Sequence, residues 1–401
     1  TLGIKEEMHE NSRNKLLVGG LHMGGDGYPN AKQTLAILTN RLHVQTIECG
    51  AWLPESMHLW RLRKASLPRK AVAFCRLLLG NLLSVLRVLR KQGQDRIPTY
   101  IPYPALFFLW WSSWLPVRWR PRCIADAYIS VWDSMYRDRS EGLTASIAAR
   151  ALKAFESRAL RAAQLVLVDT VANKQMFAHE FDLEERSLTA LPLAIQEDLF
   201  FKETPRSRIE NNTLTVLFVG TLIPLHGIKT ILEAMRLLIP DRRFRFYLLG
   251  DGQEGHLIEK FSTEVSMERF TWIREWVDLH RIADEIRDAD ICLGVFGGAG
   301  KAQRVLPFKI YMYLASGKAI VTQPFFSLPE ATPPPPLLTA RTTSAQDIAD
   351  AITRLADDEP LRNALASDSK AYYIQYLGHE KIASDWRKLL PRFNTSQQAT
   401  E

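Results

Sequence analysis

Apolar and polar residues alternate along the chain in a way that divides it into two similar halves. Short apolar runs of strand length are followed by segments in which apolar residues recur every three or four positions, as in a helix. In the first half, the runs that predict strands are 15–20, 44–49, 99–103, 123–133, 165–170 and 188–195. In the second half, they are 215–220, 245–252, 270–277, 290–298 and 318–323. Strands that alternate with helices predict an α/β fold with parallel sheets.

The pattern is interrupted once, by the polar segment 201–213, which we interpret as a linker. We therefore predict two Rossmann-like, doubly wound domains that face each other across a cleft. Ligands of such sheets bind at the carboxyl ends of the strands. The predicted divisions are a disordered lead-in at 1–14, a first domain at 15–205, a second domain at 206–375, and a terminal helix with a disordered tail at 376–401, the helix packing back toward the first domain.

Cysteine usage favours a reducing compartment. The four cysteines, Cys49, Cys75, Cys123 and Cys292, are far apart in the sequence and form no Cys-x-x-Cys pair. The N-terminal residues are polar and contain no apolar signal core. Both features predict a cytoplasmic location.

The net charge of +7 comes from one segment. Residues 58–122 contain thirteen Lys or Arg and a single acid, a net of +12, so the rest of the chain is acidic at −5. The same segment is rich in Leu and Trp, with a predicted basic helix at 58–91 and an apolar stretch at 104–116 that is shorter than the ~20 residues of a membrane span. It is typical of docking on an anionic membrane surface. The alternative is a solvated basic face over an ordinary core helix. Nucleic acid is disfavoured, because no nucleic-acid-binding motif accompanies the basic residues.

The stretch 216–238, VLFVGTLIPLHGIKTILEAMRLL, has the order strand, glycine turn, helix. Gly220 with Thr221, and His226 with Gly227, form a turn that brings backbone N–H groups and a helix N-terminus to one place. An anion such as a phosphate fits there. These glycines also fit an ordinary turn, which is the alternative reading.

Four further positions in the second half are candidates for binding a phosphate or a nucleotide. Lys309 lies in the first turn of a predicted helix after Pro307, where its ammonium and the helix dipole can act on one phosphate. Arg304 adds a second cation, and Gly250 with Asp251 ends a strand, although such a pair is also typical of a simple turn. The segment 297–301, GGAGK, fails as a phosphate loop, because the spacing of its glycines and lysine is wrong and Ala302 follows the lysine.

Taken in order, VGTLIPLHG before a helix, LLGDG after a strand, and P-x-K followed by ASGKAIV resemble the donor domain of family-4 (group 1) glycosyltransferases of GT-B architecture. The first half resembles this family more loosely, through its glycine loop, the sequence ISVWD and the sequence PLAIQEDLF. The resemblance covers about residues 15–390. It implies an enzyme that transfers a sugar from a nucleotide-sugar donor in the second domain to an acceptor in the first, usually with retention at the anomeric carbon.

The resemblance also assigns roles. Gly220, Thr221, Gly227, Gly250, Asp251, Arg304 and Met312 would line the donor site. Lys309 and His226 would stabilise the leaving diphosphate, with His226 standing where the family often has lysine. Aligned on Ala315-Ser316-Gly317, the two glutamates of the family fall on Arg304 and Met312, so the carboxylate that usually holds the ribose is absent here.

In the first domain, Gly24 and Gly25 would let the backbone approach the donor phosphate or the acceptor. Asp133 is predicted to end a strand and to orient or deprotonate an acceptor hydroxyl. A helix cap, or an ion pair with Arg137 or Arg139, is the alternative for this aspartate.

We expect a peripheral enzyme at the inner face of a bacterial cell membrane, with a saccharide acceptor linked to a polyprenyl diphosphate, in surface or exopolysaccharide assembly. No metal or other cofactor is expected, because no Asp-x-Asp or His/Cys cluster follows a strand near the diphosphate. One alternative is a GT-B fold that binds but does not turn over. A second, a Rossmann oxidoreductase, is disfavoured because Gly-x-Gly-x-x-Gly with a following acid is found after neither first strand.

Overall fold

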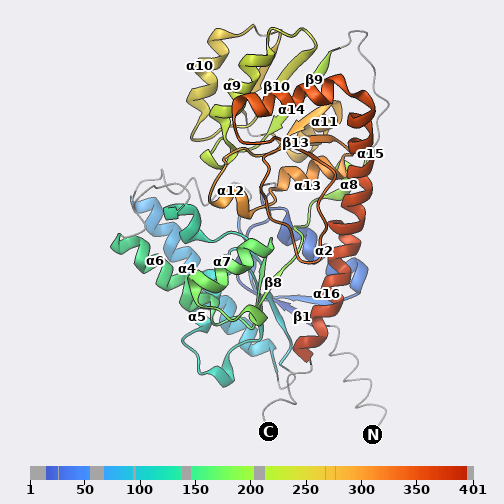
Figure 1. Cartoon of the computed structure of the whole chain (residues 1–401). Helices are drawn as coiled ribbons and strands as arrows, with labels where there is room; N and C mark the ends of the chain where they lie inside the picture. The colour runs from blue at the N-terminus through green and yellow to red at the C-terminus, as the bar shows by residue number, and fades with distance from the viewer. Residues whose placement is uncertain are drawn as a thin grey trace. The chain divides into compact units, whose positions relative to one another are not determined.

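The computed structural model describes residues 15–25, 27–54, 67–93, 96–137, 146–202, 213–266, 268–275 and 277–394. The chain forms two compact units, shown in Figure 1, and each is described by itself. Unit 1 comprises Thr1–Ala194 together with His379–Glu401, and unit 2 comprises Ile195–Gly378. The predicted lead-in at 1–14, the centre of the predicted linker, the first part of the 58–91 helix and the tail after 394 lie outside the described residues.

Unit 1 is built on a parallel sheet in the order β3-β1-β5-β6-β7-β8. Its strands are β1 (Lys15–Val18), β3 (Gln45–Glu48), β5 (Thr99–Ile101), β6 (Cys123–Asp126), β7 (Leu165–Val168) and β8 (Leu188–Ala190). A separate pair joins β2 (Leu21–His22) to β4 (Ala51–Trp52). Side chains alternate along each strand, so neighbours such as Leu16 and Leu17 belong to two different apolar clusters.

Helices cover both faces of this sheet. One cluster includes residues of α4 (Leu67–Lys91), α5 (Leu106–Ser112), α6 (Ile147–Leu160) and α7 (Val171–Phe181). The other includes residues of α2 (Asn30–Leu42) and α16 (His379–Asn394). Figure 1 shows the two groups on opposite sides of β1 and β8. Short helical turns occur at η1 (Val117–Trp119), η2 (Asp133–Arg137) and η4 (Glu185–Ser187).

The last helix, α16, belongs to unit 1 although the chain reaches it from unit 2. The Trp386 side chain is fully buried and meets the Tyr100 ring edge to face, with 5.3 Å between ring centroids. The Arg122 guanidinium donates a hydrogen bond of 2.8 Å to the Phe393 carbonyl. The amphipathic pattern at the end of the chain therefore completes the core of the first half.

Unit 2 repeats the plan with a parallel sheet in the order β11-β10-β9-β12-β13-β14. Its strands are β9 (Leu214–Val219), β10 (Phe244–Leu249), β11 (Phe270–Ile273), β12 (Ile291–Leu293), β13 (Ala319–Thr322) and β14 (Leu338–Thr339). Its helices are α8 (Glu197–Phe200), α9 (Ile228–Leu238), α10 (Gly255–Glu264), α11 (Leu279–Asp288), α12 (Lys301–Arg304), α13 (Phe308–Ala315), α14 (Ala345–Asp357) and α15 (Glu359–Tyr376), and the turn η5 (Pro224–His226) leads into α9.

Three predicted strands, 123–133, 188–195 and 290–298, are wrong over more than half their length, and the first of them carries a candidate site residue. The run 123–133 predicts a strand that ends at Asp133, but β6 ends at Asp126, and Asp133 begins the π-helical turn η2. The buried carboxylate of Glu156 on α6 accepts hydrogen bonds from the N–H groups of Val131 and Trp132, at 3.1 and 2.9 Å. These bonds satisfy N–H groups at the start of a helical segment, so an apolar stretch that resembles a strand turns into a helix.

Candidate functional site

The turn after β9 is the centre of the candidate site in unit 2. Val219 donates its N–H to the Tyr313 hydroxyl on α13 (3.0 Å), and Gly220 donates its N–H to the Leu249 carbonyl on β10 (2.9 Å). Gly220 has a φ of 151°, which side chains rarely adopt. A Cβ at Gly220 would lie 2.7 Å from the Lys309 Nζ. The backbone conformation therefore favours glycine here, and a side chain at this position would displace the end of Lys309.

Lys309 is a buried lysine. It lies in the first turn of α13, directly after Pro307 and Phe308, and is only 4% exposed. Its Nζ has no hydrogen-bond partner among the residues that the structure describes, and it lies 3.7 Å from the centroid of the Phe218 ring. Burial holds the pKa of Lys309 well below its usual range. A buried ammonium that rests only on an aromatic face is costly, and an anion would relieve that cost.

His226 lies beside this lysine and is 7% exposed. Its Nδ1 donates a hydrogen bond to the Thr221 carbonyl. Burial, and next the Lys309 charge, hold the pKa of His226 well below its usual range. Because a carbonyl accepts from Nδ1, the neutral ring has its lone pair on Nε2, and Nε2 can donate to an anion only when the ring is protonated.

Gly227 links this turn to α9. It has a φ of 68° and is the N-cap residue of the helix. A Cβ at this position would lie 2.5 Å from the Phe296 carbonyl oxygen, so the backbone of the turn packs directly on the segment after β12. The first N–H groups of α9 have no partner within the helix and add to the positive potential of the turn.

Gly250 and Asp251 follow β10, as predicted. A Cβ at Gly250 would lie 2.1 Å from the Gly220 carbonyl oxygen, so this glycine allows two strand ends to approach each other. The Asp251 carboxylate accepts a hydrogen bond from the Gly252 N–H (2.8 Å) and lies 3.4 Å from the Arg274 Nε. These contacts are those of a turn, the alternative that the sequence left open for Asp251.

Arg304 and Met312 mark the two positions where the resemblance implies glutamates. Arg304 is the last residue of α12 and is half-buried. Met312 lies on α13, one turn beyond Lys309, and is 9% exposed. A thioether is at most a weak acceptor, so Met312 cannot replace the hydrogen bonds that a carboxylate would make to a ribose.

In unit 1, the predicted loop residues Gly24 and Gly25 follow β2 and are buried. A Cβ at Gly24 would lie 2.5 Å from the Trp52 ring, so the loop packs closely on β4. Asp133 is 2% exposed, and its N–H donates to the Ser130 hydroxyl (3.1 Å). Of the two alternative partners, Arg137 forms an ion pair with Glu180, at 3.1 Å, and Arg139 lies outside the described residues.

Asp126, which sequence reasoning did not select, ends β6 in a buried polar network. Its Oδ2 accepts hydrogen bonds from the Asn30 Nδ2 (2.7 Å) and the Tyr100 hydroxyl (3.2 Å), and the Asn30 Oδ1 accepts from the Ala194 N–H (2.8 Å). Burial raises the pKa of Asp126 to about 7. The signal in the sequence is an acid that directly follows the apolar residues of a strand.

The raised pKa of Asp126 predicts a pH dependence of stability. The folded protein binds this proton more tightly than the unfolded chain, whose pKa is near 3.8, so the stability from this group is present below about pH 4 and is lost as the pH rises to about 7. The variant Asp126→Asn has no side chain at this position that can ionise. The free energy of unfolding of this variant, relative to that of wild type, is therefore expected to rise by about 1.4 kcal/mol per pH unit between about pH 4 and about pH 7. Urea unfolding at several pH values measures the difference, with the exposed Asp182→Asn as control. If the free energy of unfolding varies with pH in the same way for wild type and Asp126→Asn, the predicted role of Asp126 is wrong.

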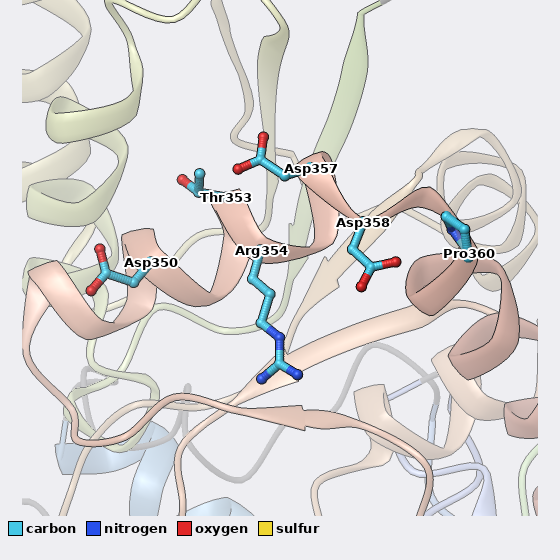
Figure 2. Close-up of a pocket in the computed structure, with 6 residues that line it drawn as sticks. All are labelled: Asp350, Thr353, Arg354, Asp357, Asp358 and Pro360. Atoms are coloured by element: carbon cyan, nitrogen blue, oxygen red, sulfur yellow. The ribbon is translucent and has the colours of Figure 1, made fainter.

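Unit 2 also has a surface pocket in which two of the acidic side chains make structural contacts. It lies on α14 and the start of α15 (Figure 2) and is lined by Asp350, Thr353, Arg354, Asp357, Asp358 and Pro360. The Asp357 carboxylate accepts from Arg243 (2.7 Å), and the Asp358 carboxylate caps α15 at the Leu361 N–H (2.9 Å). We assign no site there. Among the described residues, no group of three or more His, Cys, Asp or Glu side chains is placed to hold a metal ion.

Comparison with known proteins gives the class of this chain. Residues 213–358 match a family model described as "Glycosyl transferases group 1", and no curated protein sequence matches the chain. The matched residues include the Gly220 turn, Lys309 and Met312. The predicted resemblance to group 1 glycosyltransferases is confirmed, and with it the enzyme class, a glycosyltransferase.

Solved structures of this class share the fold. Anabaena HepE in complex with UDP is 14% identical with a TM-score of 0.64, covering 94% of this chain and 100% of that one. Sucrose-phosphate synthase from Thermosynechococcus elongatus is 15% identical with a TM-score of 0.66, covering 96% and 99%. WaaG, a glycosyltransferase involved in lipopolysaccharide biosynthesis, is 14% identical with a TM-score of 0.59, covering 92% and 99%. These likenesses confirm the predicted GT-B fold, with its two Rossmann-like sheets.

Proposed function

We propose that this glycosyltransferase takes its sugar from a nucleotide-sugar donor and that unit 2 holds the donor diphosphate at Lys309. One observation supports the proposal above all: a buried lysine Nζ that has no hydrogen-bond partner among the described residues, beside the glycine turn that precedes α9. The solved HepE structures add support, because they are complexes with UDP, with UDP and glucose, and with UDP-glucose.

In the proposed reaction, the bond between the anomeric carbon and the diphosphate oxygen breaks, and a bond to the acceptor hydroxyl oxygen forms. The electron pair of the broken bond stays on the diphosphate, and the proton of the acceptor hydroxyl passes to the leaving diphosphate. Lys309 and protonated His226 stabilise the charge that grows on the leaving diphosphate, and the positive end of the α13 dipole acts in the same direction. Retention at the anomeric carbon is the outcome that the family resemblance favours.

We assign the acceptor to unit 1, where Gly24 and Gly25 shape a buried loop and Asp133 orients the acceptor hydroxyl. The acceptor we propose is a saccharide linked to a polyprenyl diphosphate, in surface or exopolysaccharide assembly at the inner face of a bacterial membrane. The likeness to WaaG, a glycosyltransferase involved in lipopolysaccharide biosynthesis, supports this pathway class.

A fold that binds nucleotide sugars without turnover is the second candidate, and Met312 is the observation that favours it. Release of nucleoside diphosphate from UDP- and GDP-sugars, with and without a bacterial lipid extract as acceptor source, separates the two functions. Release by wild type that Lys309→Met lacks supports the enzyme. Binding of a nucleotide sugar with no release under either condition supports the silent fold.

Donor binding is expected to take up protons. The pKa of both Lys309 and His226 is lowered in the free protein, and a bound diphosphate raises both toward their usual values. Nucleotide affinity should therefore fall as the pH rises through the pKa values of the complex. Calorimetric titration with UDP in buffers of different ionisation enthalpy measures the uptake. His226→Asn, which cannot become charged, should take up fewer protons; the same uptake as in wild type would exclude His226 from the contact.

A further inference from the structure

The helix α4 of unit 1 has an apolar face that no described residue covers. Val72, Leu79, Leu83 and Leu86 are between 49% and 69% exposed. Their spacing of seven, four and three residues places them on one side of the helix. A row of exposed leucines on a 25-residue helix is unusual for a soluble surface and indicates that something binds there.

The opposite face of α4 is attached to the body of unit 1 by buried hydrogen bonds. The Ser84 hydroxyl accepts from the Gly20 N–H (2.8 Å), and the Asn81 Oδ1 accepts from the Leu21 N–H (3.1 Å). The Trp111 Nε1 donates to the Leu78 carbonyl (2.9 Å). Both Ser84 and Asn81 are at most 1% exposed.

These hydrogen bonds distinguish between two ways in which α4 could bind a lipid bilayer, crossing it or lying in its interface. Its segment Ala71–Lys91 is long and apolar enough to cross a membrane. Crossing would remove Asn81 and Ser84 from their partners and leave polar groups in hydrocarbon, which is costly. Lying in the plane of the interface keeps every one of these bonds and buries only the leucine face.

The charges on α4 identify the kind of surface. The helix contains Arg76, Arg87, Arg90 and Lys91 with exposed side chains, and no acidic residue occurs between 67 and 91. Arg76 and Arg90 lie along the leucine face, and Arg87 lies at its border. The leucines can contact the acyl chains, and the arginines beside them can contact negatively charged headgroups. This arrangement fits an anionic lipid surface better than a neutral one.

We propose that α4 is an in-plane docking helix: Val72, Leu79, Leu83 and Leu86 insert at the headgroup boundary of an anionic bilayer, and Arg76, Arg87 and Arg90 contact lipid phosphates. The proposal deepens the proposed function, since a lipid-linked acceptor requires such a surface. Through Asn81 and Ser84, the docked helix contacts the β1–β2 turn, from which the chain continues directly to Gly24 and Gly25.

Sedimentation with vesicles tests the proposal on the full chain, without nucleotide. Wild type is expected to bind vesicles of phosphatidylcholine and phosphatidylglycerol, to bind less as salt is raised, and to bind phosphatidylcholine alone weakly. The double variant Leu79→Glu, Leu83→Glu should lose roughly tenfold or more in affinity, and Arg87→Gln and Arg90→Gln roughly fivefold each. Leu237→Glu is the matched control, since Leu237 is 51% exposed on α9 of unit 2.

Each contrary outcome overturns the proposal in a different way. Wild-type affinity in the double variant, with an unchanged melting temperature, means that the leucine face does not contact lipid. If wild type stays with the membrane after an alkaline carbonate wash, α4 crosses the bilayer and does not lie in the interface. A soluble dimer that the double variant dissociates means that a second copy covers α4. None of these results depends on sugar transfer, so failure of the docking surface and failure of the proposed glycosyl transfer are distinguishable.

Discussion

Replacing Lys309 with methionine is expected to lower kcat for sugar transfer by roughly 10²–10³-fold, because it removes the cation that stabilises the leaving diphosphate. The same change should raise the melting temperature of the free protein. Lys309 Nζ is buried without a hydrogen-bond partner among the described residues, and methionine fills similar volume without a charge. Loss of activity together with a gain in stability is the result to look for, by product assay and thermal melting.

A second buried lysine in the same unit provides the control. Lys318 is 7% exposed, but its Nζ donates to the Arg287 and Ala289 carbonyls, at 2.6 and 2.9 Å. Lys318→Met removes both of these hydrogen bonds, so it should lower the melting temperature and leave nucleotide affinity unchanged. If both variants are destabilised and both lose nucleotide binding, Lys309 is only a structural lysine and its assignment to the diphosphate is wrong.

Gly220→Ala is expected to abolish measurable nucleotide binding while the protein remains folded. The new Cβ would lie 2.7 Å from the Lys309 Nζ and so occupies the space next to the ammonium. A side chain at a φ of 151° adds backbone strain of about 1–3 kcal/mol to the free energy of folding. Nucleotide binding measured by calorimetry, beside a urea unfolding curve, gives both effects.

Gly93→Ala is the control that separates the effect of backbone strain from the effect of a Cβ beside Lys309. Gly93, in unit 1, has a φ of 56°, and a Cβ there would meet nothing within 4 Å. This variant should lose stability in the same way as Gly220→Ala but bind nucleotide like wild type. Unimpaired binding by Gly220→Ala would show that the anion lies elsewhere.

The glycine turn after β9 and the helix position of Lys309 were predictable because each depends on local sequence. A strand, a glycine turn and a helix follow one another between 216 and 238, and Lys309 follows a proline that marks the start of α13. What the sequence could not give is the contact between these two segments. The buried position of Lys309 over Phe218 depends on parallel strands that bring residues ninety positions apart to one sheet edge.

The segment 123–133 of unit 1 was predicted less well, because its polar residues depend on distant partners. The 123–133 run is mostly apolar, but β6 ends at Asp126, whose carboxylate accepts hydrogen bonds from Asn30 and Tyr100. Glu156, on a helix beyond Asp133, then turns 131–137 into a helical segment. Neither contact has a signature within a single window of sequence.

The most direct test of the central claim is the melting temperature of wild type and Lys309→Met with UDP, GDP and other nucleoside diphosphates. A ligand that binds only the folded protein stabilises it by RT ln(1 + [L]/Kd). We predict that at least one nucleoside diphosphate raises the melting temperature of wild type and does not raise that of Lys309→Met. No shift in wild type with any nucleotide, or an equal shift in both proteins, would contradict a diphosphate site at Lys309.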